Sequence, residues 1–218
     1  MKLFGKITVV AIVTLILSAC SSKEKLVLPE VQNSIKPQKV WQDKVGKGVG
    51  HYESGLKPVI VDDTVYAASR NGIVVAKNLS NGRTLWSFDL RTEGSSSLLS
   101  RFSSDTARIA GGVAFNNNML YLGTEDGEVF ALNAQDGQLL WRVAVKGEVL
   151  TSPAVGEGLV VVATTAGNLV ALDPATGEQR WIFEDEQPAL TIRGLSEPVI
   201  ESGGVLYGSG TGRVGVLI

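Results

Sequence analysis

Apolar and polar residues alternate in short runs along most of the chain, and these runs recur in a fixed order. Three segments, 65–72, 120–127 and 160–167, align without gaps, and each is a mostly apolar run that ends in glycine. A second glycine lies ten residues beyond each, and a tryptophan follows four residues later. These positions are Gly82, Gly137 and Gly177, and Trp86, Trp141 and Trp181. A fourth copy starts at 205–212, so the pattern predicts a repeat protein.

The third copy predicts the elements within each repeat most clearly. Short runs rich in β-branched residues occupy 152–155, 159–164, 168–173 and 179–183, and glycine or proline lies between them. Such runs favour strands, and glycine and proline favour the turns that join them. Four strands in a repeat of about 40 to 45 residues are typical of a β-propeller blade.

Two irregularities interrupt the repeat. Trp41 lies 17 residues before Pro58, the same interval that separates Trp181 from Pro198, so 40–45 is predicted to be an outer strand that closes the ring on the last blade. The segment 91–109 is rich in serine, lacks alternation and is predicted to be an inserted loop.

The number of repeats does not complete a ring. The sequence reaches Ile218 inside the third strand of the fourth repeat, and eight such blades would need nearly twice this length. We therefore expect an all-β propeller of the tryptophan-docking type, with about four of eight four-stranded blades present in 40–218 and the C-terminal half missing.

The turn before each tryptophan resembles a known motif. Residues 171–181, Ala-Leu-Asp-Pro-Ala-Thr-Gly-Glu-Gln-Arg-Trp, are similar to the tryptophan-docking motif of quinoprotein-type propellers, and looser copies precede Trp141 and Trp86. The resemblance implies that each tryptophan packs between neighbouring blades, against the glycine turn. The tryptophans and glycines of the repeat are therefore expected to be structural, the alternative being an aromatic ligand cage.

The N-terminus predicts export. Lys2 and Lys6 accompany an apolar stretch at 7–17, which is shorter than the roughly 20 residues needed to cross a bilayer. Leu17-Ser18-Ala19-Cys20 resembles the lipobox of bacterial lipoproteins, which implies lipidation of Cys20, and Ser21 after it implies transfer to the outer membrane. We expect a signal peptide at 1–19 and a lipidated cysteine with a flexible tether at 20–39. The alternative is an ordinary secretory signal with a coincidental cysteine.

The amino-acid composition limits the kinds of binding and catalytic site that the chain can form. The chain has 20 basic and 22 acidic residues, and removal of 1–19 with its two lysines leaves 18 against 22, a net charge of −4. This balance gives no indication of nucleic-acid binding, which would need a clustered basic surface. His51 is the only histidine, so no histidine metal cluster or Ser-His-Asp triad can form in this chain, and we predict no catalytic and no metal-binding residues.

The lipobox, the polar tether and the short-looped repeats together resemble the BamB family, lipoproteins of the outer-membrane β-barrel assembly machinery. The most specific match is Leu190-x-Ile192-Arg193-Gly194, where the family has Leu-x-Leu-Arg-Gly. The resemblance implies a loop whose Leu190, Ile192 and Arg193 bind the POTRA domains of BamA. Alternatively, Leu190 and Ile192 are core residues of a strand and Arg193 is a surface charge.

The resemblance also implies a function. We expect a non-enzymatic scaffold lipoprotein of the Bam complex, on the periplasmic face of the outer membrane, that assists unfolded β-barrel substrates and carries no cofactor beyond the lipid on Cys20. The alternative is a quinoprotein dehydrogenase, which uses the same docking motif around pyrroloquinoline quinone and calcium. Its acidic calcium ligands cannot be assigned in this sequence.

Overall fold

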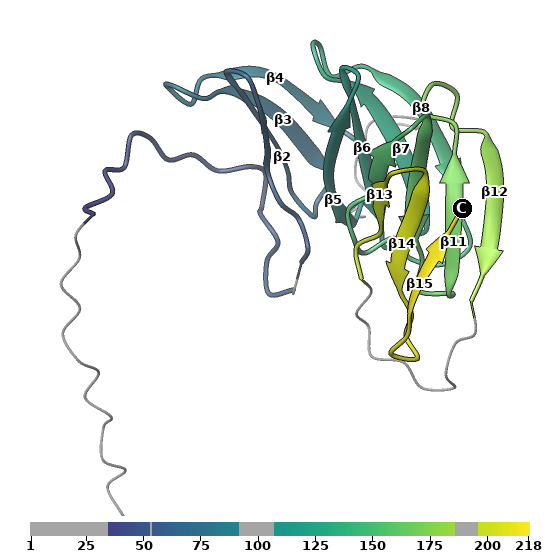
Figure 1. Cartoon of the computed structure of the whole chain (residues 1–218). Coiled ribbons are helices and arrows are strands. Elements are labelled where there is room, and N and C mark those ends of the chain that lie inside the picture. The colour runs from purple at the N-terminus through teal and green to yellow at the C-terminus, as the bar shows by residue number, and fades with distance from the viewer. Residues whose placement is uncertain (1–34, 53, 92–106, 186–195) are drawn as a thin grey trace, which may run out of the picture. The chain divides into compact units, whose positions relative to one another are not determined.

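The computed structural model describes residues 35–52, 54–91, 107–185 and 196–218, and every regular element in these ranges is a strand (Figure 1). The chain divides into two units, Met1–Gln38 and Lys39–Ile218, and all the strands belong to the second. No helix in the described ranges could cross a membrane.

Within the described ranges, fifteen strands form four separate antiparallel sheets, which we call blades 1 to 4. Blade 1 contains β1 (Val59–Val61), β2 (Thr64–Ala68), β3 (Ile73–Asn78) and β4 (Thr84–Asp89). Blade 2 contains β5 (Ile109–Asn116), β6 (Met119–Thr124), β7 (Glu128–Asn133) and β8 (Leu139–Ala144). Blade 3 contains β9 (Ala154–Gly156), β10 (Leu159–Ala163), β11 (Asn168–Leu172) and β12 (Gln179–Glu184). Blade 4 contains β13 (Val199–Glu201), β14 (Gly204–Gly208) and β15 (Val214–Leu217).

The predicted fold class is confirmed, and the strands of the third repeat agree with β9 to β12 within two residues. The largest difference is at β9, which starts at Ala154 rather than Ser152. Pro153 lies between them and has no backbone N–H to donate to a neighbouring strand, so pairing begins after it. A β-bulge recurs beside each tryptophan, where Trp86, Trp141 and Trp181 pair with the alanine of the preceding strand and the next pair skips a residue.

The hydrophobic core lies in layers between successive blades. Tyr66, Val74 and Phe88 of blade 1 share one apolar cluster with Phe130 and Leu132 of blade 2. A second cluster joins blades 2 and 3, and a third joins blades 3 and 4. Blades 2 and 3 therefore depend on a neighbour at each side to bury both of their faces, as expected for a repeat architecture.

The antiparallel strand order creates two ends in every blade. The β1–β2 and β3–β4 turns of blade 1, with their equivalents in blades 2 and 3 and the β13–β14 turn of blade 4, lie at one end, which we call the turn face. The β2–β3 turns and their equivalents lie at the other end with the described ends of the connections between blades, and we call this end the connection face. The β14–β15 turn marks the connection face at the lower end of Figure 1.

Residues 40–45, predicted to be an outer strand, belong to no strand in the described residues. The four described blades do not include the last blade of a closed ring, so pairing of this segment with that blade stays a prediction. Trp41 packs on blade 1 as the resemblance to the tryptophan-docking motif implies. The position of the segment is therefore set by its side chains and not by a backbone ladder.

Candidate functional site

The docking tryptophans form joints between neighbouring units of the repeat. The indole Nε1 of Trp86 donates a hydrogen bond to the carbonyl of Ala134 in blade 2 at 2.9 Å. Trp141 donates in the same way to Pro174 of blade 3 at 2.9 Å, and Trp41 to Leu79 of blade 1 at 2.7 Å. Each tryptophan therefore reaches the β3–β4 type turn of the next blade.

The glycines of the repeat lie directly under these indoles. A Cβ added to Gly137 would lie 2.5 Å from Cε3 of Trp86, and one added to Gly177 would lie 2.7 Å from Cε3 of Trp141. Both glycines also have positive φ, +76° and +75°, a conformation that costs little only for glycine. Glycine is thus required here by the turn and by the close approach of the ring.

The joint between blades 2 and 3 carries an additional hydroxyl. Tyr121 packs against Trp141 with ring centroids 5.9 Å apart, and its hydroxyl donates to the same Pro174 carbonyl at 3.3 Å. Burial raises the pKa of Tyr121 to about 12, so the hydroxyl stays protonated and remains a donor at neutral pH. These aromatic side chains are packed against protein, which fits a structural role.

The joint between blades 3 and 4 is more open. Trp181 and Phe183 line an apolar cavity of about 280 Å³ together with Val205 and Leu217 of blade 4. Trp181 therefore faces blade 4, as the repeat predicts, and packs against its apolar cluster.

The described chain on either side of 186–195 lies on the connection face. The backbone N–H of Asp185 donates to the carbonyl of Gly167, next to the β10–β11 turn. The hydroxyl of Ser196 bonds the backbone of Gly208, next to the β14–β15 turn, at 2.7 and 2.9 Å. The predicted partner-binding residues Leu190, Ile192 and Arg193 belong to this connection and lie outside the described residues, as does Cys20.

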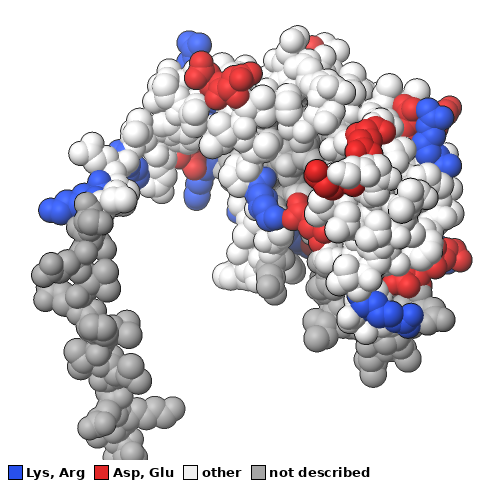
Figure 2. Space-filling view, in the orientation of Figure 1, with Lys and Arg blue, Asp and Glu red and all other residues white. Residues whose placement is uncertain are grey.

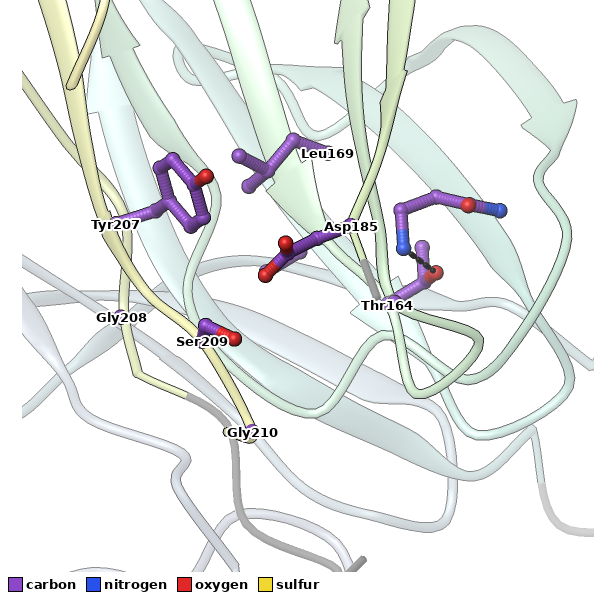
Figure 3. A pocket seen from close by; sticks show the side chains of 10 residues that line it. Thr164, Leu169, Asp185, Tyr207, Gly208, Ser209 and Gly210 are labelled. Carbon is purple, nitrogen blue, oxygen red and sulfur yellow. Dashed lines mark hydrogen bonds between the residues drawn. The ribbon is translucent and has the colours of Figure 1, made fainter. Parts of the chain in front are cut away.

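Between these two ends, a shallow notch separates blades 3 and 4 (Figure 3). Asp185 lies there beside Tyr207 and Ser209, whereas Leu90 and Val145 occupy the equivalent repeat positions. The notch holds about 20 Å³, which is room for about one water molecule and too little for a substrate. The replacement of an apolar residue by a carboxylate marks this junction as different from the others.

The sequence patterns did not predict one ion pair on the connection face. Both nitrogens of the Arg70 fork, Nε and one Nη, bond the carboxylate of Glu125 at 2.8 Å, and the ring of Tyr52 covers the guanidinium at 3.8 Å. Both charged side chains are only 12% exposed. Arg70 and Glu125 hold the same repeat position in adjacent blades, and this is the sequence feature that could have predicted the pair. The pair links the β2–β3 and β6–β7 turns.

The described residues bring together no group of three or more histidine, cysteine, aspartate or glutamate side chains that could hold a metal ion. His51 is exposed in a turn, and acidic and basic side chains are mixed over the visible surface of the blades (Figure 2). The geometry here offers packed joints and polar surfaces, which suit protein contacts.

Comparisons with known proteins agree with this arrangement. Residues 92–217 match the family described as "Outer membrane protein assembly factor BamB", and residues 32–150 match the β-propeller domain of glucose, ethanol and alcohol dehydrogenases. The chain is 39% identical to the BamB of Yersinia pestis over 93% of its own length and 52% of that protein. It is 40% identical to the BamB of Vibrio cholerae, over 100% of this chain and 54% of that one.

A solved structure supports the same relationship. The crystal structure of BamB from Moraxella catarrhalis superposes with a TM-score of 0.63 at 25% identity, covering 76% of this chain and 46% of that one. The chain spans about half the length of the curated relatives that it matches. The repeats, the tryptophan joints and these matches together show that the chain belongs to the BamB family of outer membrane protein assembly factors.

Proposed function

We propose that this chain acts as a scaffold in the assembly of outer-membrane β-barrel proteins, binding the POTRA domains of BamA within the Bam complex and assisting unfolded barrel substrates. The observation that carries the proposal is the match to BamB proteins across 93% of the chain. The proposed role is non-enzymatic and needs no cofactor.

The proposed contact with BamA is the connection between β12 and β13. Leu190 and Ile192 would supply apolar anchors, and Arg193 a fork of donors for carboxylate or carbonyl oxygens, a combination common at interface hot spots. The described ends of this connection bond to the turns at Gly167 and Gly208, so both ends of the proposed contact segment are held on the connection face.

Co-purification with BamA tests this contact. Arg193→Glu in the intact chain should reduce the BamA recovered at least about tenfold, because a lost charged hydrogen bond costs about 1.5 to 3 kcal/mol. Arg83→Glu is the matched control, since Arg83 is an exposed arginine on the turn face. Equal recovery with the two variants would remove Arg193 from the contact.

We also propose that the lipid on Cys20 holds the protein to the outer membrane, facing the periplasm. Two or more acyl chains on one residue give stable anchoring, because each buried methylene contributes about 0.8 kcal/mol. Cys20→Ala should move the protein from the outer-membrane fraction to the soluble periplasmic fraction. Retention of this variant in the membrane would show that the anchor lies elsewhere.

The dehydrogenase alternative is tested by adding pyrroloquinoline quinone and calcium to the purified chain. The scaffold proposal expects no bound chromophore after dialysis. Stoichiometric binding with dye-linked alcohol oxidation would replace the scaffold proposal with the enzyme.

A further inference from the structure

Two repeat positions meet at every joint. The first position is the second residue after each docking tryptophan. The other is the residue five places after the first glycine of the next repeat. The two positions lie in the same core layer. In the three joints between blades these pairs are Phe88 with Leu132, Val143 with Leu172, and Phe183 with Leu217. All six side chains are apolar, so these joints share one chemistry.

The joint between the N-terminal segment and blade 1 has a different chemistry at the same two positions. Asp43 is the second residue after Trp41, and Lys77 is the residue of blade 1 that corresponds to Leu132 and Leu172. The Nζ of Lys77 lies 2.5 Å from Oδ2 of Asp43 and 2.7 Å from the hydroxyl of Thr84. Both interactions are absent from the apolar joints, where Leu139 and Gln179 replace Thr84.

Lys77 needs these partners because it is buried. It is 5% exposed, against 0% for Leu132 and Leu172, and an ammonium removed from water is strongly destabilising unless it is paired. The Asp43 side chain remains 51% exposed, so the aspartate can be solvated when the segment leaves, whereas Lys77 depends on the contact. The side of blade 1 that faces the segment is thus matched to an acidic residue.

The pairing also rejects incorrect partners. An outer strand such as β4, with Phe88 in place of Asp43, would leave Lys77 buried without a carboxylate if it packed on blade 1. Conversely, residues 41–43 packed on blade 2 or 3 would place the Asp43 carboxylate against Leu132 or Leu172. Specific interfaces combine attraction of the correct partner with such penalties for the wrong one.

We infer that blade 1 carries, around Lys77 and Thr84, a docking surface selective for an acidic Trp-x-Asp segment, and that its occupant is Trp41–Asp43 of the same chain. Trp41 supplies the affinity that it shares with Trp86 and Trp141, through the bond to Leu79 and its packing on Gly82. Asp43 supplies the selectivity. The N-terminal segment is therefore directed to blade 1 and to no other blade.

Hydrogen exchange of the tryptophan indoles in the intact chain tests this inference. The N–H groups of Trp41, Trp86 and Trp141 are all hydrogen-bonded, and each NMR signal can be assigned with a Trp→Phe variant. Asp43→Asn and Lys77→Leu should each speed exchange of the Trp41 indole about tenfold or more, the equivalent of one lost charged hydrogen bond. The signals of Trp86 and Trp141 should not change, which shows that the blades remain folded.

Restoration separates selectivity from simple loss of a contact. The charge swap Asp43→Lys with Lys77→Asp, and the apolar pair Asp43→Phe with Lys77→Leu, should both return Trp41 exchange to within about threefold of the wild type. Asp63→Asn, in an exposed turn of blade 1, is the matched control and should have no effect. Unchanged Trp41 exchange in either single variant, or a charge swap that fails to restore it, would overturn the inference.

Discussion

The two faces of the blades keep the repeat to different degrees. On the turn face, blades 1 to 3 share a capping residue (Asn78, Asn133 or Asp173) whose side-chain oxygen accepts backbone N–H groups of the turn. In each turn the N–H of the repeat glycine donates to the carbonyl of that capping residue. The turn face is therefore built from one unit used three times.

The connection face varies from blade to blade. One position of its turns holds Arg70, Glu125, Thr165 and Gly210 in blades 1 to 4. The described ends of the β4–β5 and β12–β13 connections lie on the same face, bonded to the turns at Arg70, Gly72 and Gly167. The packing of one blade on the next therefore restricts the turn face, whereas the connection face can vary without loss of the fold, as loops that carry function commonly do.

The largest expected effect comes from removing a tryptophan from a turn-face joint. Trp141 is 8% exposed, and Trp141→Ala should lower the free energy of unfolding by about 3 to 5 kcal/mol, the usual cost of a buried aromatic truncated to alanine. Urea denaturation measures the loss. The adjacent Leu140 is 46% exposed, so Leu140→Ala should change stability by no more than about 0.5 kcal/mol. Similar losses of unfolding free energy in the two variants would contradict the claim that the tryptophan joint is the main stabilising element.

A smaller effect is expected from the glycine beneath the indole. Gly137 and Gly158 have nearly the same φ, +76° and +77°, but a Cβ would meet Trp86 at Gly137 and nothing within 4 Å at Gly158. Gly137→Ala should therefore destabilise the protein by about 2 kcal/mol more than Gly158→Ala, because only the first adds a steric overlap to the backbone strain. Thermal or urea unfolding of both variants isolates the contact from the strain.

The connection face should tolerate more change. The Arg70–Glu125 pair is fixed at both ends and 12% exposed, so a double-mutant cycle with alanine should give a coupling of about 1 to 2 kcal/mol. The Arg108–Asp126 pair on the same face is 44% and 49% exposed and should give less than about 0.5 kcal/mol. If the coupling measured for Arg70–Glu125 is as small as that expected for Arg108–Asp126, the Arg70–Glu125 pair is also a solvated surface contact.

Local pattern was sufficient for the blades but not for every contact. The repeat pattern predicted the strands, and the resemblance of residues 171–181 to the tryptophan-docking motif implied the joints, because the turn and the tryptophan lie within eleven residues of sequence. It did not predict Lys77–Asp43, whose partners lie 34 residues apart, or Arg70–Glu125, 55 residues apart. Such pairs emerge only when repeats are compared position by position. The strand expected at 40–45 does not form in the described residues, because a strand needs a neighbour to pair with and the blade expected to supply it is not among the four described.

The smallest effect distinguishes the third turn from the other two on the turn face. Asp173 is the one charged residue among the three capping positions, and the bonds from Arg180 and from the N–H groups of Ala175 and Thr176 lower its pKa from 3.8 to about 2. A pKa lowered in the folded state stabilises the protein above the unfolded value, and this stabilisation is lost as the pH falls from about 4 through about 2. Asp173→Asn should remove this pH dependence and keep the turn, because asparagine forms the same cap at Asn78 and Asn133. Urea midpoints of the two proteins between pH 5 and pH 2 test this. The difference between the urea midpoints of the two proteins should shrink only as the pH falls from about 4 through about 2. A difference that stays constant over the whole range would mean that the charge of Asp173 adds nothing to the stability of the turn.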